Sequence, residues 1–168
     1  MGLCVIANAG TSFLVTFFKN LGITLTQGDV AKPNSIFECI LDIIGIAIVP
    51  AICEEFAMRC CALGLLKNYG KAFGVVSVSV VFGLLHGNVI QFIFAFLVGL
   101  VLAYITIKTE SIIPAMCIHA LNNGMSAVSD TVNYAAGKEV NVTVGFFAFW
   151  LLVGIIATIY LAIKRKLT

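Results

Sequence analysis

Charged residues are scarce in this chain. It has 10 Lys and Arg and 8 Asp and Glu in 168 residues, or 11%, whereas a soluble domain carries about 25%. A soluble domain of this size needs more charge, because much of its surface faces water. No basic stretch typical of nucleic-acid binding occurs, so we expect no nucleic-acid partner. The one cationic run, residues 164–166, directly follows an apolar segment and is typical of a membrane-edge anchor.

Several chemical motifs are missing as well. The sequence has no HExxH, the framework of the common zinc metalloproteases, and no internal repeat of the kind found in many transporters. No CxxC pair occurs, and all cysteines lie in apolar segments, so we interpret them as small packing residues and not as a disulfide framework. We expect no cofactor. The six cysteines are Cys4, Cys39, Cys53, Cys60, Cys61 and Cys117.

Apolar residues dominate instead, at 61% of the chain with a mean hydropathy of +1.09. Runs such as 89–107 do not alternate between polar and apolar residues, so they predict helices and not barrel strands. We therefore predict an all-α, polytopic membrane helix bundle of about six transmembrane helices with a polar intramembrane cavity, forming one domain over 1–168. The predicted helical segments are 3–18, 36–66, 72–87, 89–107, 112–128 and 143–163, with a polar loop over 129–141.

Two features of these segments bear on topology. The segment 36–66 is long enough to span with a tilt, or to form two helices broken near Pro50. No basic residue precedes Lys19, so the first segment is interpreted as a membrane helix and not as a cleaved signal peptide. Positive charge favours a cytoplasmic C-terminus in the cell membrane. That side would hold Lys67, Lys71, Lys108, Lys164, Arg165 and Lys166, and the other side Lys19, Lys32 and Lys138.

A few polar residues interrupt the apolar segments. A charge at mid-bilayer costs at least about 2.5–3.5 kcal/mol, so such residues usually have a partner or a function. Glu55 and Arg59 are four residues apart, share a helix face and can pair, while Glu54 points about 100° around the helix. Glu38 and Asp42 share a face with like charge, and we interpret them as solvated residues at the membrane interface.

Two further pairs lie on later segments. Phe82 and His86 are one helical turn apart, and so are His119 and Asn123. Two adjacent donors on one face can bind a developing oxyanion, although polar contacts that hold helices together explain each pair equally well. Asn122 points to another face and is interpreted as such a helix contact. Counted from the lysine turns, the polar residues of the three segments reach similar depths of roughly 16–22 Å, which indicates one shared site.

These three motifs, EExxxR, FxxxH and HxxxN in that order, resemble the CAAX protease and bacteriocin-processing family of intramembrane glutamic endopeptidases. The resemblance covers about 36–128, which would form the catalytic core. It implies a metal-independent peptidase acting on membrane peptides or proteins, lipidated or not. Glu54 would be the general base, with His86 holding the attacking water. His119 and Asn123 would stabilise the oxyanion, and Glu55 and Arg59 would orient the site.

Other functions remain open from the residues alone. Glu54, His86 and His119 could instead bind zinc, since two histidines and one glutamate form a known catalytic set. The chain could also be a non-catalytic membrane protein for immunity or partner binding. A cysteine protease would pair His86 with a thiol, and a transporter would use the intramembrane charges as an ion path.

Overall fold

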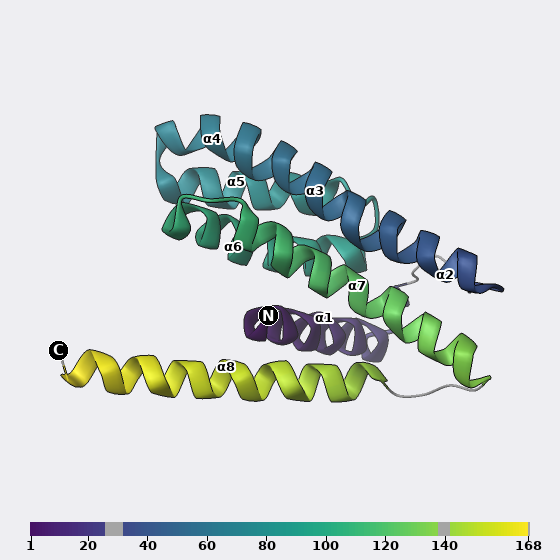
Figure 1. Ribbon diagram of the computed structural model, residues 1–168. Coiled ribbons are helices and arrows are strands. Elements are labelled where there is room, and N and C mark those ends of the chain that lie inside the picture. The colour runs from purple at the N-terminus through teal and green to yellow at the C-terminus, as the bar shows by residue number, and fades with distance from the viewer. Residues whose placement is uncertain (26–31, 138–141, 168) are drawn as a thin grey trace.

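The computed structural model describes residues 1–25, 32–137 and 142–167, and within these ranges it contains helices and no strand. The helices lie side by side as a bundle (Figure 1). The predicted all-α membrane bundle is confirmed. Within the described ranges, three helical segments are long and apolar enough to cross a membrane, namely Gly2–Asn20, Ile36–Tyr69 and Val89–Thr109. The first of these segments is α1 and the third is α6. The remaining helices outside these three segments are α5 (Lys71–Leu84), α7 (Ile113–Ala136) and α8 (Val142–Leu167).

The segment Ile36–Tyr69 is one continuous helical rod. At its start, the Ser35 hydroxyl accepts from the Glu38 backbone N–H at 3.2 Å, and the Glu38 carboxylate accepts from the Asn34 N–H at 2.7 Å. Exposed Glu38 thus caps the rod. The rod does not break at Pro50, which lies in the first turn of α3 directly after a π-helical turn, and the helical segment continues to Tyr69. The rod comprises α2 (Ile36–Asp42), a π-helix (Ile43–Ile48), α3 (Val49–Glu55), a π-helix (Phe56–Ala62), α4 (Leu63–Leu66) and a 3₁₀ turn (Lys67–Tyr69).

Small residues let α5 pack closely on its neighbours. A Cβ at Gly83 would lie 2.9 Å from the Phe92 ring, and one at Gly99 would lie 3.2 Å from Ser79. Both glycines therefore allow α5 and α6 to approach at van der Waals distance, as in other membrane bundles. A buried cluster of Leu63, Val78 and Ala103 joins this hairpin to the rod. A second buried cluster joins α1, α6 and α7 and consists of Cys4, Ala7, Val98, Leu102 and Ala115.

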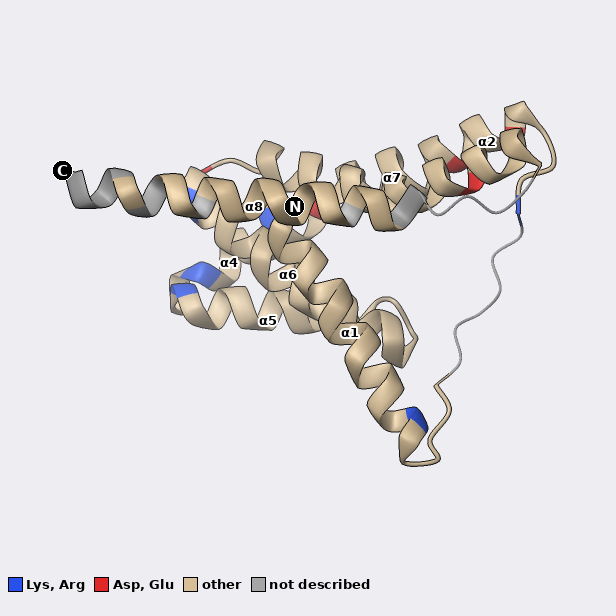
Figure 2. Ribbon diagram, turned by 90° about the horizontal axis from the view of Figure 1, so that it is seen from below, with Lys and Arg blue, Asp and Glu red and all other residues tan. Residues whose placement is uncertain are grey.

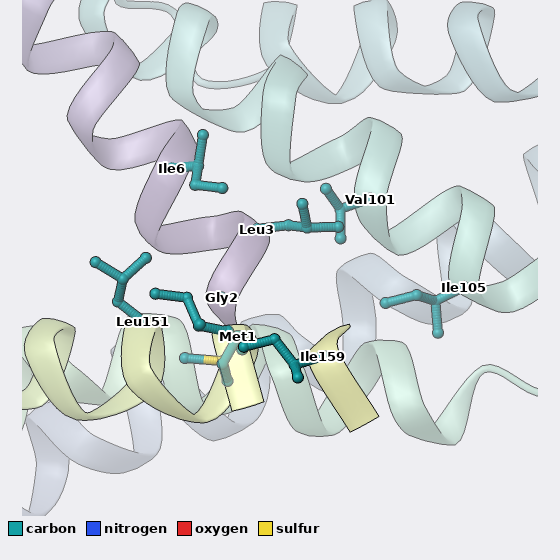
Figure 3. A pocket seen from close by; sticks show the side chains of 10 residues that line it. Met1, Gly2, Leu3, Ile6, Val101, Ile105, Leu151 and Ile159 are labelled. Atoms are coloured by element: carbon teal, nitrogen blue, oxygen red, sulfur yellow. The ribbon is translucent and has the colours of Figure 1, made fainter. Parts of the chain in front are cut away.

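Helix α8 covers one side of the bundle and contacts α1 and α7 (Figure 1). It approaches α1 closely where two glycines meet, since a Cβ at Gly2 would lie 3.4 Å from the Gly154 Cα. Beside this contact an apolar cavity of about 390 Å³ lies between α1, α6 and α8, lined by residues such as Leu3, Ile6 and Val101 (Figure 3). Its walls carry hydrocarbon groups, so it suits an acyl chain better than water.

Helix α7 is longer than the sequence indicates. The predicted polar loop over 129–141 is wrong for 129–136, which continue α7 to Ala136, and 138–141 lie outside the described residues. The helix ends at Gly137, whose φ of 62° is the left-handed conformation that glycine adopts without strain. Polar residues had suggested a loop, but they occupy one face of the helix while Met125 and Ala127 pack into the interior.

The outer surface of the bundle is apolar. Phe13 and Leu65 are each 69% exposed, and many other large hydrophobic side chains are also exposed. A surface of this kind fits hydrocarbon and not water. The cysteines are only partly packing residues, because Cys4 and Cys39 are buried whereas four thiols lie on this surface. The exposed ones are Cys53, Cys60, Cys61 and Cys117.

Charges lie mostly towards the helix ends (Figure 2). The α4–α5 and α6–α7 turns, which contain Lys67, Lys71 and Lys108, lie at one end of the bundle (Figure 1). The end of α1, the start of α2 and the α5–α6 turn lie at the opposite end. The side chains of residues 164–166, and Lys138 altogether, lie outside the described residues. The predicted cytoplasmic C-terminus therefore stays a prediction.

Candidate active site

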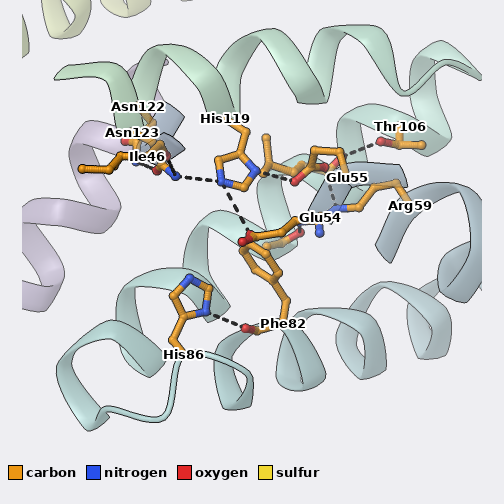
Figure 4. A network of polar contacts seen from close by, with 12 residues as sticks. Ile46, Glu54, Glu55, Arg59, Phe82, His86, Thr106, His119, Asn122 and Asn123 are labelled. Carbon is orange, nitrogen blue, oxygen red and sulfur yellow. Dashed lines mark hydrogen bonds and ion pairs between the residues drawn. The ribbon is translucent and has the colours of Figure 1, made fainter. Parts of the chain in front are cut away.

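The polar network contains a buried ion pair between Arg59 and Glu55 (Figure 4). The Arg59 Nε lies 3.0 Å from the Glu55 Oε2, and both side chains are fully buried. The predicted pairing of these residues one turn apart is confirmed. The Arg59 guanidinium also lies 4.6 Å above the centre of the Phe82 ring, and its Nη2 donates to the Gly99 carbonyl at 3.5 Å. The opposite charges of the carboxylate and the guanidinium compensate one another, which offsets the cost of burying them.

The same carboxylate fixes His119 on α7. The His119 Nδ1 lies 2.8 Å from the Glu55 Oε1. An ionised carboxylate can only accept a hydrogen bond, so Nδ1 carries the proton and donates it. The Nε2 atom of the neutral ring is then an acceptor, and the Asn123 side-chain amide donates to it at 3.1 Å. The tautomer and the orientation of this imidazole are thus set by its neighbours.

Asn123 also makes a second hydrogen bond. Its Nδ2 donates to the Ile46 backbone carbonyl at 3.2 Å. In a regular helix that carbonyl would accept from the residue four positions later, which is Pro50 and has no N–H. The proline therefore leaves an acceptor for Asn123, and both N–H groups of the amide are in use. Sequence reasoning missed this contact, although the position of Pro50 four residues after Ile46 signals it.

Glu54 lies beside this network with one oxygen unsatisfied. Its side chain is 41% exposed, yet its Oε2 atom is buried and has no hydrogen-bond donor among the described residues. The His119 Nε2 lies 3.8 Å away, too far for a direct hydrogen bond. The carboxylate is thus accessible through one side while its second oxygen points into the polar interior. An oxygen placed in this way can accept a hydrogen bond from an added donor.

His86 faces the network from the end of α5. Its Nδ1 lies 2.8 Å from the Phe82 carbonyl, which can only accept, so Nδ1 carries the proton and Nε2 has a free lone pair. The Phe82 ring meets the His86 ring at 5.1 Å and the His119 ring at 5.8 Å, both edge-on. Figure 4 shows the His86 ring turned towards the side where Glu54 and His119 lie. Phe82 therefore separates the two imidazoles and holds both.

A polar cavity of about 580 Å³ adjoins the site. His86, Asn122 and Asn123 form its inner end. Asn122, predicted to point to another face, also lines this cavity, and its amide donates to the Asn123 Oδ1 at 3.4 Å. The remaining walls come from α1, α6, α7 and the rod, and they include Asn8, Thr11, Ser12, Ile46, Ile90, Gln91, Phe94, Met125, Ser126, Ser129 and Asp130.

The arrangement of donors bears on the zinc alternative. Within the described ranges, no three side chains from His, Cys, Asp and Glu lie so that they could hold one metal ion. Glu54 and His119 approach one another at 3.8 Å, and both histidines place Nδ1 against a protein oxygen. Histidines that bind a metal through Nε2 make the same Nδ1 contacts, so these contacts do not separate the two alternatives.

The chain matches a family of known proteins. A family model described as type II CAAX prenyl endopeptidase Rce1-like matches residues 36–125, more than half of the chain. This range contains every residue of the network described above. No curated protein and no solved structure matches the chain.

Proposed function

Because the chain belongs to the type II CAAX prenyl endopeptidase Rce1-like family, we propose that it is a metal-independent intramembrane endopeptidase. It acts as a multi-pass protein of the cell membrane on peptides or proteins, lipidated near the scissile bond or not. The proposal depends most on one observation. The buried Glu54 Oε2 lacks a donor and lies 3.8 Å from His119, at the edge of the network that joins Arg59, Glu55, His119 and Asn123.

In the first step, Glu54 acts as general base. Its unsatisfied oxygen accepts a hydrogen bond from the attacking water, and its partly exposed side chain leaves that water a path to the carboxylate. The His86 Nε2, which bears a free lone pair, accepts the second hydrogen of the water and orients it. Proton transfer to Glu54 leaves hydroxide to attack the peptide carbonyl. General base catalysis of this kind contributes about 10²–10⁴-fold.

His119 and Asn123 act on the oxyanion that forms. In the resting site the Asn123 amide donates one hydrogen bond to the His119 Nε2 and the other to the Ile46 backbone carbonyl. When Glu54 passes the water proton to the His119 Nε2, 3.8 Å away, that atom becomes a donor and releases the amide hydrogen of Asn123. Both groups then face the oxyanion as donors, and Glu55 stabilises the imidazolium through Nδ1. Protonation of His119 is therefore the step that makes both groups available as donors to the oxyanion. Collapse of the tetrahedral intermediate then restores a carbonyl, breaks the C–N bond and transfers this proton to the leaving amine nitrogen.

Glu55 and Arg59 are positioning residues in this scheme. The Arg59 guanidinium balances the charge of Glu55, and the Glu55 carboxylate accepts from the His119 Nδ1 and so fixes the tautomer of that ring. Neither needs to touch the substrate. Their complete burial agrees with this role, because a residue that binds substrate must be reachable from the cavity.

The decisive test is peptide cleavage by the purified protein in detergent micelles. The substrate is a quenched fluorescent peptide with a farnesylated cysteine near its C-terminus, together with the same peptide lacking the lipid. We expect cleavage by the wild type and a loss of at least about 10²-fold with Glu54→Gln, which keeps the size of the side chain. Equal cleavage by Glu54→Gln would refute the proposal.

Two controls separate the alternatives. Activity that disappears with a chelator, together with one zinc per chain by metal analysis, would assign a zinc peptidase instead. A replacement of Cys53, Cys60 and Cys61 by serine should leave cleavage unchanged, because these thiols lie on the outer surface. Absence of cleavage, with Glu54→Gln retaining a biological function of the wild type, would favour a non-catalytic role in immunity or partner binding.

A further inference from the structure

A polar stripe runs along α7 away from the catalytic groups. Starting at His119, polar side chains recur every three or four residues and therefore lie on one face of the helix. The stripe contains His119, Asn122, Asn123, Ser126, Ser129, Asp130 and Asn133. Its section from Asn122 to Asp130 lines the polar cavity. A substrate held in the cavity therefore lies along this stripe.

Asp130 is the one acidic or basic residue among those that line the cavity, apart from the titratable His86. Its side chain is half-buried, and it forms no ion pair with any residue in the described ranges. The opposite wall is uncharged, since Asn8 and Thr11 on α1 donate to the carbonyls of their own helix. A carboxylate in such a place has unused capacity to bind a cation.

The helix geometry gives the distance from the reaction centre. Asp130 follows Asn123 by seven positions, or about 10 Å along α7. An extended peptide advances about 3.3 Å per residue. A chain whose scissile carbonyl lies at Asn123 therefore brings the residue about three positions away to the level of Asp130.

We propose that Asp130 determines specificity and selects substrates with a lysine or arginine about three residues from the scissile bond. The inference rests on the proposed function for the location of the scissile bond. Asp130 does not take part in the chemistry, so its removal changes which peptides are preferred and leaves catalysis itself intact. The neutral amides and hydroxyls around it bind peptide backbone without regard to side-chain charge.

The test is a set of quenched peptides in which a single lysine is moved through the four positions on each side of the scissile bond. In maltoside micelles, which carry no charged headgroup, we expect kcat/KM to be highest with lysine about three positions away, by about tenfold over glutamine. Asp130→Asn should abolish that preference and leave cleavage of the glutamine peptide unchanged. Asp130→Lys should reverse it in favour of a glutamate peptide.

A matched control tests for general electrostatic attraction. Asp42 lies on α2 outside the cavity lining, and Asp42→Asn should keep the lysine preference. If Asp42→Asn and Asp130→Asn lower the preference equally, the protein's overall field and not a binding contact is responsible, and the proposal is wrong. A flat response of the wild type to lysine position also overturns it.

A binding measurement keeps the two proposals distinguishable. Fluorescently labelled peptides are titrated onto the Glu54→Gln variant, which needs no turnover, with and without Asp130→Asn. Tighter binding of the lysine peptide that depends on Asp130 supports the inference even where the wild type cleaves nothing, whereas that absence of cleavage refutes the proposed chemistry. Equal binding of lysine and glutamine peptides, or no binding of either, overturns the inference.

Discussion

The buried Glu55–Arg59 pair is the residue-scale feature on which the geometry of the site depends. Arg59→Met keeps most of the volume and removes the positive charge, so Glu55 loses its countercharge in an apolar interior. We expect the free energy of unfolding to fall by about 3–5 kcal/mol. Thermal unfolding in detergent micelles, followed by loss of helical circular dichroism, measures this change.

The double variant Glu55→Gln with Arg59→Met is the matched comparison. It removes both charges and should recover a large part of the lost stability, because no uncompensated charge is then buried. Cleavage activity should stay low, since neutral glutamine no longer holds the imidazolium of His119. A double variant as unstable as Arg59→Met would show that packing, and not charge balance, sets the cost.

Asn123 tests the oxyanion site. Asn123→Ala should lower kcat by about 10²–10³-fold with little change in KM, because the lost donor acts on the oxyanion and not on the bound substrate. Asn122→Ala is the control, since Asn122 lines the same cavity and, among the described residues, its side chain donates a hydrogen bond to Asn123. Steady-state kinetics on one peptide compares them. A similar loss in both variants would argue for a general effect on cavity shape.

At this scale, the sequence predicts contacts within a helix better than contacts between helices. The pairs Glu55–Arg59 and His119–Asn123 follow from a spacing of four, and the structure contains both. The contact between Glu55 and His119, 64 positions apart, depends on how the rod and α7 pack. A shared depth in the membrane indicated that these groups are near one another, but it could not say which atoms meet.

At the scale of elements, Pro50 links the shape of the rod to the site. Pro50→Ala introduces an N–H that competes with Asn123 for the Ile46 carbonyl. We expect unchanged or higher thermal stability, because alanine suits a helix interior better, and a fall in kcat of several-fold as Asn123 loses its anchor. Pro114→Ala is the control, because Pro114 lies in the first turn of α7 where a proline is neutral.

Element boundaries show where sequence reasoning fails in physical terms. From the sequence, the segment 36–66 was compatible with one helix or with two helices. The structure contains one helical rod, with a π-helical turn directly before Pro50. The sequence predicted a loop after residue 128 because helices were predicted from apolar runs alone, and the residues that follow are polar. In a bundle with an internal cavity, one polar face is compatible with a helix, so α7 continues to Ala136.

At the scale of the whole molecule, the exposed apolar belt predicts how the cysteines react. A charged maleimide applied to the protein in lipid bilayers should label none of Cys53, Cys61 and Cys117, because these exposed thiols lie on the apolar surface that hydrocarbon covers. Cys60 is not part of this prediction, because it lines a cavity with Lys67 and Lys71. After SDS, mass spectrometry should find all six cysteines modified. Rapid labelling of Cys53, Cys61 and Cys117 in intact bilayers would show that this surface faces water.

The polar face of α7 has a consequence for biogenesis. A segment with so many amides and hydroxyls partitions poorly into hydrocarbon by itself, and α7 is not one of the helices apolar enough to cross alone. It therefore enters the bilayer against α6 and the rod, which it contacts in the folded protein. A chain that ends before residue 113 lacks His119 and Asn123, so we expect the proposed hydrolytic site to be complete only late in translation.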